Sequence, residues 1–288
     1  MSVRNNEDRL GHRDLGDTSP TPQAHQGSQS SVFSFVVPTE MVVLPSGGKY
    51  YPEDHPLYNT ETIEVKHMTA KEEDILTSKS LLKKGIAINR VLQSVIVDKG
   101  VDVNSLLIGD KNAIIVATRI HAYGPKYETN VTCPACSATV KHSFDLAEVG
   151  YDHDAQEIMN MDFVSNKGNN FVITLPKTQA RVEVRLLNGK DEKLLADALS
   201  MKRKHNLPET MLTDQFRTYI VSVNESSDKE NINSFVSAVP ASDSRFLRTV
   251  YDKLVPNINM TQNFICTSCD YDAEMEVPLN ADFFWPKQ

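Results

Sequence analysis

The chain has 288 residues, of which 40% are hydrophobic and 24% are charged, which is enough for one or two folded domains. Thirty basic residues against thirty-eight acidic ones give a net charge of -8, and this balance argues against nucleic-acid binding through a broad basic surface. No apolar run approaches the roughly 20 residues that cross a bilayer. The polar N-terminus, in place of a signal peptide, predicts a protein that is cytosolic where it is made.

Residues 1–31 are rich in Ser, Gln, Asn, Asp and Arg and contain few large apolar side chains. Such a stretch buries too little surface to offset the entropy lost on ordering, so it predicts a disordered arm. The arm is either a dispensable tail or a segment that becomes ordered on a partner. Residues 44–52 follow it, and their Gly and Pro content predicts a turn. They lack the spacing of a phosphate loop.

A strand at residues 63–65 is followed by a helix start, where Thr69 and Glu72 form a predicted capping box. The charged run at residues 71–74 is most simply a solvated helix start, in preference to a paired-carboxylate active site. Residues 85–97 carry apolar side chains at helical spacing. These are Ile86, Ile88, Val91, Leu92, Val95 and Ile96.

Asp110 is expected to cap a helix that runs to about Tyr123, with Ile114, Ile115, Ala117 and Ile120 mostly buried. Its counterpart is a helix at residues 242–254. Gly124-Pro125 and Val255-Pro256 end these two helices. The apolar stripes of both helices predict core positions, not cofactor contacts.

The chain contains an apparent internal repeat. Residues 63–76 align without gaps on residues 182–195, at an offset of 119 (182 − 63). Residues 104–107 match 233–236 at an offset of 129, and the growing offsets predict loop insertions in the second copy. Asn188 is the expected N-cap of the second copy, with Asp191 and Glu192 near the helix start. We therefore predict two repeats, residues 32–150 and 151–288, each a strand, helices and a hairpin; coincidental similarity is the alternative.

All four cysteines occur in two C-x-x-C pairs, Cys133 with Cys136 and Cys266 with Cys269. The first pair lies between strand-like runs at 127–131 and 138–144, and the second lies between runs at 263–265 and 273–277. Each pair is therefore placed at the turn of a predicted β-hairpin. Four thiolates on two such turns can hold one zinc ion tetrahedrally.

Three other readings of the cysteines are weaker. Free thiols scattered by chance would rarely form two such pairs. A thioredoxin-like redox pair opens a helix, and two disulfides need an oxidising compartment. We therefore predict a structural zinc site at a pseudo-twofold seam, with one hairpin from each repeat. The predicted fold class is α+β, with duplicated strand–helix–hairpin units joined by this zinc-ribbon-like site.

No motif for a nucleotide, a dinucleotide, a catalytic zinc or a nucleophilic serine occurs. His121 and His142 fit surface or strand positions better than ligand positions. The sequence therefore predicts that the protein is not an enzyme.

Several segments, taken in order, resemble the T4-like bacteriophage baseplate protein family. They are residues 44–52, 63–65, 68–76 and 109–112, then Arg119-Ile120 and Tyr123-Gly124 leading to the first cysteine pair. The resemblance covers residues 37–150 well and the remainder more loosely. It implies a component or assembly factor of the baseplate hub of a contractile tail.

The resemblance also implies the partners and the location. The partners would be other phage tail or baseplate proteins, with no small-molecule substrate. The locations would be the host cytoplasm during assembly and the tail baseplate of the virion. The alternative is a zinc-ribbon module that binds nucleic acid. The acidic balance argues against it, as does the lack of Lys and Arg with interleaved aromatic residues near the cysteines.

Overall fold

The computed structural model describes residues 36–151, 161–278 and 281–284. The chain divides into two units, Met1–Val36 and Val37–Gln288. The arm expected at residues 1–31 lies outside the described residues. Within the second unit, residues 37–151 are called the first half and residues 161–284 the second half.

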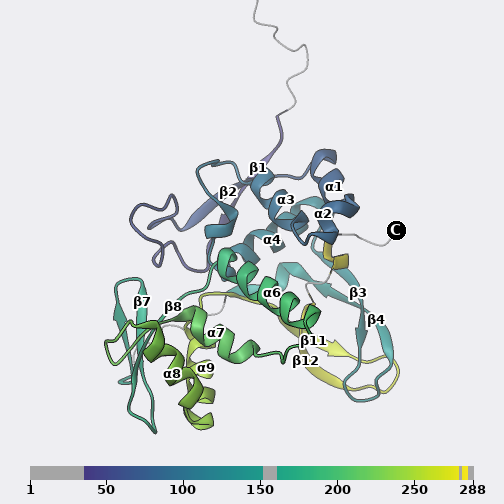
Figure 1. The fold of residues 1–288 in the computed structure, drawn as a ribbon. Coiled ribbons are helices and arrows are strands. Elements are labelled where there is room, and N and C mark those ends of the chain that lie inside the picture. The colour runs from purple at the N-terminus through teal and green to yellow at the C-terminus, as the bar shows by residue number, and fades with distance from the viewer. Residues whose placement is uncertain (1–35, 152–160, 279–280, 285–288) are drawn as a thin grey trace, which may run out of the picture. The chain divides into compact units, whose positions relative to one another are not determined.

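The first half begins with a two-stranded antiparallel sheet and continues through helices to a hairpin (Figure 1). Val42 pairs with Ile63 across this sheet, and both are buried, whereas Met41 and Glu64 are exposed. The elements are β1 (Thr39–Val43), β2 (Thr62–Lys66), α1 (Ala70–Thr77), α2 (Lys79–Lys83), α3 (Ala87–Val95), η2 (Val103–Ser105), α4 (Ile108–Tyr123), β3 (Lys126–Thr132), β4 (Thr139–Asp145), η3 (Leu146–Glu148) and β5 (Gly150–Tyr151).

The second half is built around a four-stranded antiparallel sheet in the order β6-β7-β8-β9. Its helices follow, and a second hairpin comes near its end (Figure 1). The elements are β6 (Val164–Lys167), β7 (Asn170–Thr174), β8 (Arg181–Arg185), α6 (Gly189–Lys204), α7 (Met211–Tyr219), β9 (Ile220–Val223), α8 (Lys229–Ala238), α9 (Ala241–Leu254), β10 (Ile258–Asn259), β11 (Thr261–Ile265), β12 (Asp272–Glu276) and η4 (Ala281–Phe284).

Reciprocal capping starts the first helix of each half. The backbone amide of Thr69 donates to the Glu72 carboxylate at 2.9 Å, and that of Asn188 donates to Asp191 at 3.0 Å. The Asn188 side chain accepts from the Asp191 amide in return. Both predicted capping arrangements are therefore confirmed, because each carboxylate satisfies an otherwise unpaired amide at the helix start.

The expectation of a solvated helix start at residues 71–74 is wrong for one residue. Glu72 has no exposed surface. Its carboxylate accepts from the Ser94 hydroxyl at 2.5 Å and lies 3.6 Å from the Lys66 ammonium. These contacts hold the pKa of Glu72 at about 2, although burial alone would raise it.

The expected role of Asp110 is also corrected. The helix begins at Ile108 after the N-cap Leu107, so Asp110 lies inside the first turn. Its carboxylate is fully buried and accepts from the Ser46 amide at 2.9 Å, the Ser46 hydroxyl at 2.6 Å and the Tyr51 hydroxyl at 2.7 Å. The residue therefore attaches the turn at residues 44–52 to α4.

α4 lies against elements of both halves, including β1, α3, α6, β10 and η3. Ile114 and Ile115 are buried as expected, and Ala117 and Ile120 are half-buried. Arg119 is buried as well, and its guanidinium donates to the carbonyls of Phe283, Gly124 and Lys126. These three bonds compensate the desolvation of the charge. Among the described residues, no helix combines the length and the apolar character needed to cross a bilayer.

The halves meet where α4 and α6 begin. The Ile108 amide donates to the Leu187 carbonyl at 3.2 Å, and the Gly189 amide donates to the Leu106 carbonyl at 3.0 Å. Gly109 touches the chain that follows α9, since a Cβ on it would lie 1.8 Å from the Pro256 carbonyl oxygen. Only glycine allows this approach.

Most of the segments that align in the sequence have the same secondary structure. The expected match of residues 104–107 with 233–236 is wrong, because the former lie in and after η2 whereas the latter lie within α8. β2 and α1 recur as β8 and α6 at an offset of 119, and β3 and β4 recur as β11 and β12 at an offset of 133. Val65 bridges to Ile96, and the corresponding Val184 pairs with Ile220. The α+β class is confirmed. The duplication, and its boundary near residue 150, stay predictions.

Candidate metal centre

The first cysteine pair occupies the turn of the β3–β4 hairpin, as predicted. Thr132 and Thr139 are the last paired residues before the turn. The Cys133 amide donates to the Ala138 carbonyl, and the Ser137 amide donates back to the Cys133 carbonyl, both at 2.9 Å. Ser137 has a φ of 60°, in the left-handed region. This single strained residue lets the chain reverse so that both thiols lie on one side of the turn.

The second pair repeats this geometry in the β11–β12 hairpin. The Cys266 amide donates to the Tyr271 carbonyl at 2.9 Å, and the Asp270 amide donates to the Cys266 carbonyl at 3.0 Å. Asp270 has a φ of 54°. Each of these positions is 133 residues after its counterpart in the first hairpin (266 − 133). The two turns are therefore locally equivalent.

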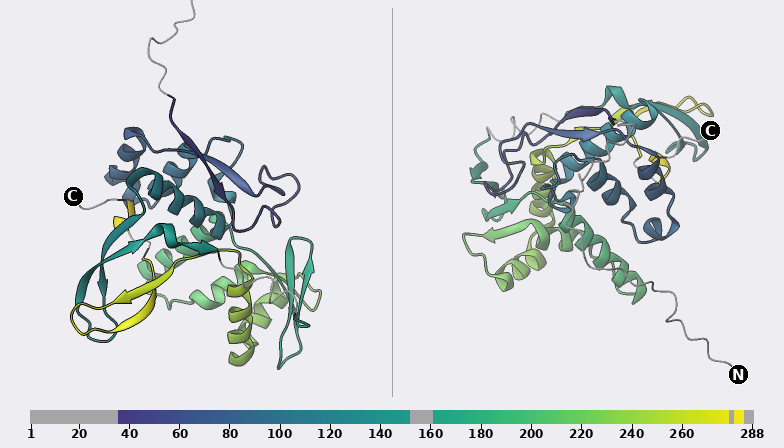
Figure 2. Two further views of the ribbon diagram at one scale, coloured as in Figure 1. Left: turned by 180° about the vertical axis from the view of Figure 1, so that it is seen from behind. Right: turned by 90° about the horizontal axis from the view of Figure 1, so that it is seen from above.

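The two hairpins lie side by side, with their turns at the same end (Figure 2). The Sγ atoms of Cys133 and Cys269 are 3.8 Å apart, as are those of Cys136 and Cys266. All four sulfur atoms lie within 4.8 Å of one another. Four ligands at the usual Zn–S distance of about 2.3 Å in a tetrahedron are separated by about 3.8 Å. The cluster therefore fits one tetrahedral ion of that size.

The four thiols are free, and one thiol of each pair is covered. Cys133 and Cys266 are buried, whereas Cys136 and Cys269 are exposed. A disulfide needs its sulfur atoms about 2.05 Å apart, far closer than the distances between the hairpins. The arrangement is therefore that of a ligand set and not of two cross-linked pairs.

Side chains from both hairpins fix their mutual position. The side-chain amide of Gln262 accepts from the Asp145 amide at 3.0 Å and donates to the Asp145 carbonyl at 2.6 Å. The His142 ring meets the Phe264 ring edge-on, with centroids 5.2 Å apart. Phe264 and Phe144 are buried. These contacts bring the turns together through protein atoms alone.

The pKa values of two thiols move in opposite directions. Burial raises the pKa of Cys133, but the N–H groups of Cys136 and Ala135 and the neighbouring thiols outweigh it and lower the pKa to about 7. The Tyr271 amide lowers the pKa of Cys269, but the other three thiols and burial raise it to about 12. Thiols that share charge in a cluster lose their protons in separate steps. A bound cation would favour the thiolate at every position.

The other residues singled out in the sequence lie elsewhere. Residues 44–52 form turns, as predicted. His142 lies in β4, and His121 lies in the last turn of α4, where its ring stacks on that of His67. None of these three segments places a ligand atom in the cysteine cluster, although the His142 ring contacts Phe264 of the second hairpin.

One equivalence was missed in the sequence. Asp243 in the first turn of α9 is buried and accepts from the amides of Lys177 and Thr178 and from the Thr178 hydroxyl. It stands 133 residues after Asp110, which makes the corresponding contacts with Ser46 and Tyr51. The shared offset with the cysteine pairs was the available signal.

The comparisons with known proteins give one match. No curated protein and no solved structure matches this chain. The family model described as "T4 bacteriophage base plate protein" matches residues 37–285. That range contains both halves and all four cysteines. The chain therefore belongs to the T4 bacteriophage base plate protein family.

Proposed function

We propose that this protein is a structural or assembly component of the hub of a phage tail baseplate, and that it acts through contacts with other tail proteins. The family match over residues 37–285 carries this proposal. The resemblance at residues 44–52, 63–76 and 109–112 supports the hub in particular. No catalytic role is assigned to any described residue.

We further propose that Cys133, Cys136, Cys266 and Cys269 bind one structural zinc ion. Four thiolates fill a tetrahedral shell and leave no position for a substrate or a water molecule. The 3.8 Å sulfur separations support a single ion shared by the two hairpins. The ion would connect segments about 130 residues apart, and the halves it connects are inferred to be copies of one ancestral unit.

The surface of the hairpins counts against the nucleic-acid alternative. The exposed side chains of β12 are the acidic residues Asp272, Glu274 and Glu276, and Asp270 precedes them. In the first hairpin, Lys141 is paired with Glu128 at 2.5 Å. An acidic surface repels phosphate, so a zinc-ribbon that binds DNA or RNA is the weaker reading.

The test is genetic and structural. A phage with an early stop codon in this gene should make heads but no complete baseplates, and the wild-type gene supplied from a plasmid should restore them. Electron microscopy of the lysate measures both results. Complete, infectious tails without the protein would refute the proposal. A plasmid that encodes Cys133→Ser should restore fewer tails than one that encodes Ser268→Ala, whose position lies in the other turn but is not a sulfur ligand.

A further inference from the structure

The sheets of the two halves differ at one edge. β7 is flanked by β8 on one side and β6 on the other, whereas β2 is the only described strand that pairs with β1. The registers correspond, since Val42 pairs with Ile63 and Ile173 pairs with Val182. β1 therefore corresponds to β7 at an offset of 131 (173 − 42), and no described strand corresponds to β6.

The free edge of β1 presents the backbone groups that β7 uses. Leu44 donates to the Glu61 carbonyl, so the even-numbered residues of β1 face β2 and Thr39, Met41 and Val43 face outward. Thr174, which corresponds to Val43, donates to the Phe163 carbonyl just before β6. No described residue forms a backbone hydrogen bond with the outward groups of β1. Such an edge is a template for another strand.

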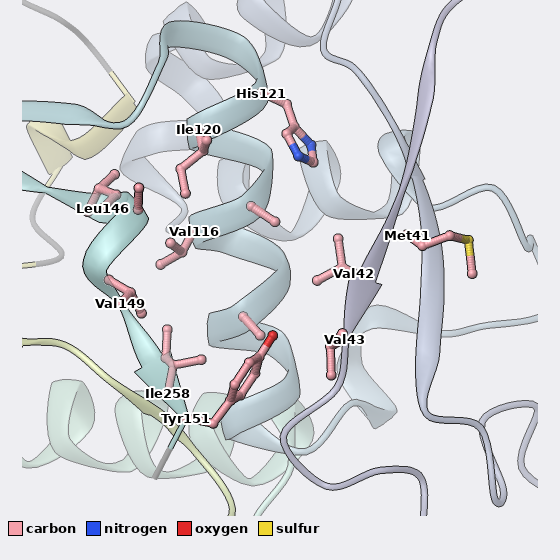
Figure 3. A pocket seen from close by; sticks show the side chains of 13 residues that line it. Met41, Val42, Val43, Val116, Ile120, His121, Leu146, Val149, Tyr151 and Ile258 are labelled. Carbon is pink, nitrogen blue, oxygen red and sulfur yellow. The ribbon is translucent and has the colours of Figure 1, made fainter.

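An apolar groove of about 250 Å³ lies beside this edge (Figure 3). Val42 on β1 forms one wall, Val116 and Ile120 on α4 form the floor, and Leu146 and Val149 form the far wall. In the second half, α9 corresponds to α4, and its Phe246 packs edge-on against Phe163 with centroids 5.2 Å apart. Phe246 corresponds to the smaller Ala113, another groove residue. The groove is therefore open where the second half packs a half-buried side chain, Phe163, from the segment that leads into β6.

The two edges also differ in their charged side chains. The ammonium of Lys167, on β6, lies 2.7 Å from the carboxylate of Glu183 on β8. Glu183 corresponds to Glu64, which is exposed on β2 and makes no ion pair with a described residue. A strand added to β1 in the manner of β6 would bring its own basic side chain to Glu64.

We propose that the free edge of β1 and the adjoining groove bind an extended segment of a partner protein, which adds antiparallel to β1 as β6 adds to β7. The bound segment has an aromatic or large aliphatic residue opposite Val43 and a Lys or Arg opposite Thr39. Main-chain hydrogen bonds hold it to β1, and the two side chains give selectivity. This inference rests on the proposed role as a connector of tail proteins, because it names the surface through which one partner is held.

The test uses β6 as the probe on the full-length protein. A capped synthetic peptide that copies residues 162–168 is added at saturation, and amide hydrogen exchange is followed by NMR. Exchange at Thr39, Met41 and Val43 should slow about tenfold or more, while the amide of Val42, already bonded to β2, changes little. Unchanged exchange at all three outward amides would overturn the proposal.

Charge reversal provides the matched control. Glu64→Lys should weaken peptide binding about fivefold, and a peptide with Glu in place of Lys167 should recover that loss. Glu53→Lys, which makes the same change at an exposed loop position, should leave affinity unchanged. Equal effects of Glu64→Lys and Glu53→Lys, or no recovery, would exclude the β6-like mode.

Two further outcomes are distinguishable. Slow exchange at the outward amides without peptide, increasing with protein concentration, would identify a second copy of this chain as the occupant and overturn the proposal. Peptide binding does not depend on whether phage tails need the gene. Failure of the peptide with the genetic requirement intact therefore refutes only the docking inference, and the reverse result refutes only the hub.

Discussion

The buried carboxylates of the two halves show how equivalent positions acquire different chemistry. Asp110 accepts one backbone amide and two hydroxyl groups, whereas Asp243 accepts two backbone amides and one hydroxyl. Burial raises the pKa of both. It dominates at Asp110, whose pKa is raised, but at Asp243 the hydrogen bonds from Thr178 and Lys177 outweigh it and the pKa is lowered. The donors around a buried carboxyl group therefore decide in which direction its pKa moves.

Some elements recur in both halves, and others differ between them. The caps at Thr69 and Asn188 recur at an offset of 119, and the hairpin turns recur at an offset of 133. The helices after the caps differ in length, since α1 has 8 residues and α6 has 16. The edge strand β6 likewise has no counterpart among the described strands of the first half.

The largest effect is expected at the cysteines, where the halves should behave as one. Cys133→Ser and Cys266→Ser should each lower the Tm by about 10 °C or more, because three thiolates hold a divalent ion poorly. The double mutant should lose little more, since both changes act through one ion. Thermal unfolding and metal analysis of the three variants measure this. Additive losses would mean two separate sites.

The starts of α4 and α9 should differ in the stability that an alanine substitution costs. Gly109→Ala should cost about 2–3 kcal/mol, because its Cβ would overlap the Pro256 carbonyl. The corresponding Ser242 is exposed, so Ser242→Ala should change stability by less than about 0.5 kcal/mol. Chemical denaturation gives both values. A small loss at Gly109 would show that α4 can move away from the second half.

The buried carboxylates should respond unequally to the loss of charge. Asp243→Asn should lower the Tm by roughly 4–8 °C near neutral pH, because the amides of Lys177 and Thr178 donate to different oxygens and the NH2 that replaces one of them cannot accept. Asp110→Asn should lower it less, because the hydroxyls of Ser46 and Tyr51 can rotate to accept instead.

The contributions of Asp243 and Asp110 to stability should change in opposite directions with pH. The stability from Asp243, whose folded pKa is lowered, is present above the unfolded pKa near 3.8 and is lost as the pH falls. That from Asp110, whose folded pKa is raised, is present below 3.8 and is lost as the pH rises through the folded pKa. Melting curves at neutral and acidic pH should therefore show the two variants converging in acid. Parallel curves would contradict the assignment.

Loss of the capping carboxylate should destabilise the two halves to a similar extent. Glu72→Gln and Asp191→Asn should each cost about 2 kcal/mol at neutral pH, because Glu72 is buried with a lowered pKa and Asp191 also pairs with Arg185 through two hydrogen bonds. For Glu72 this contribution is complete above the unfolded pKa of 4.5 and is lost as the pH falls toward about 2. Asp74→Asn, an exposed change in the same helix, is the control. A Glu72→Gln penalty that stays constant down to pH 2 would contradict the buried, ionised state.

Local signals were sufficient for the elements that form from nearby residues. The capping box at Thr69 and the turns at Cys133 and Cys266 join residues a few positions apart, and the sequence predicted each of them. The helix expected at 85–97 is shorter, α3 at Ala87–Val95, because Gly85 has a positive φ before it and Ile96 bridges to Val65 of β2 after it.

Contacts between residues far apart in the chain could not be predicted from the sequence. An acidic residue near a helix start resembles a cap, and the burial of Asp110 depends on Ser46 and Tyr51, which lie 64 and 59 positions away. β9 is four residues long and is recognisable as a strand only through its pairing with β8. The proximity of the two cysteine pairs was predictable for a different reason, since the chemistry of the thiols implied a shared ion.

The division of the cysteine cluster between distant hairpins has a consequence for synthesis on the ribosome. Cys136 and Cys266 are separated by 130 positions. At translation rates of about 5–20 residues per second, the second pair follows the first by roughly 7–26 s. During that interval the nascent chain carries two thiols without their partners, open to oxidation or to a wrong cation. Reducing conditions during synthesis would therefore protect an unfinished half-site until the chain can close it.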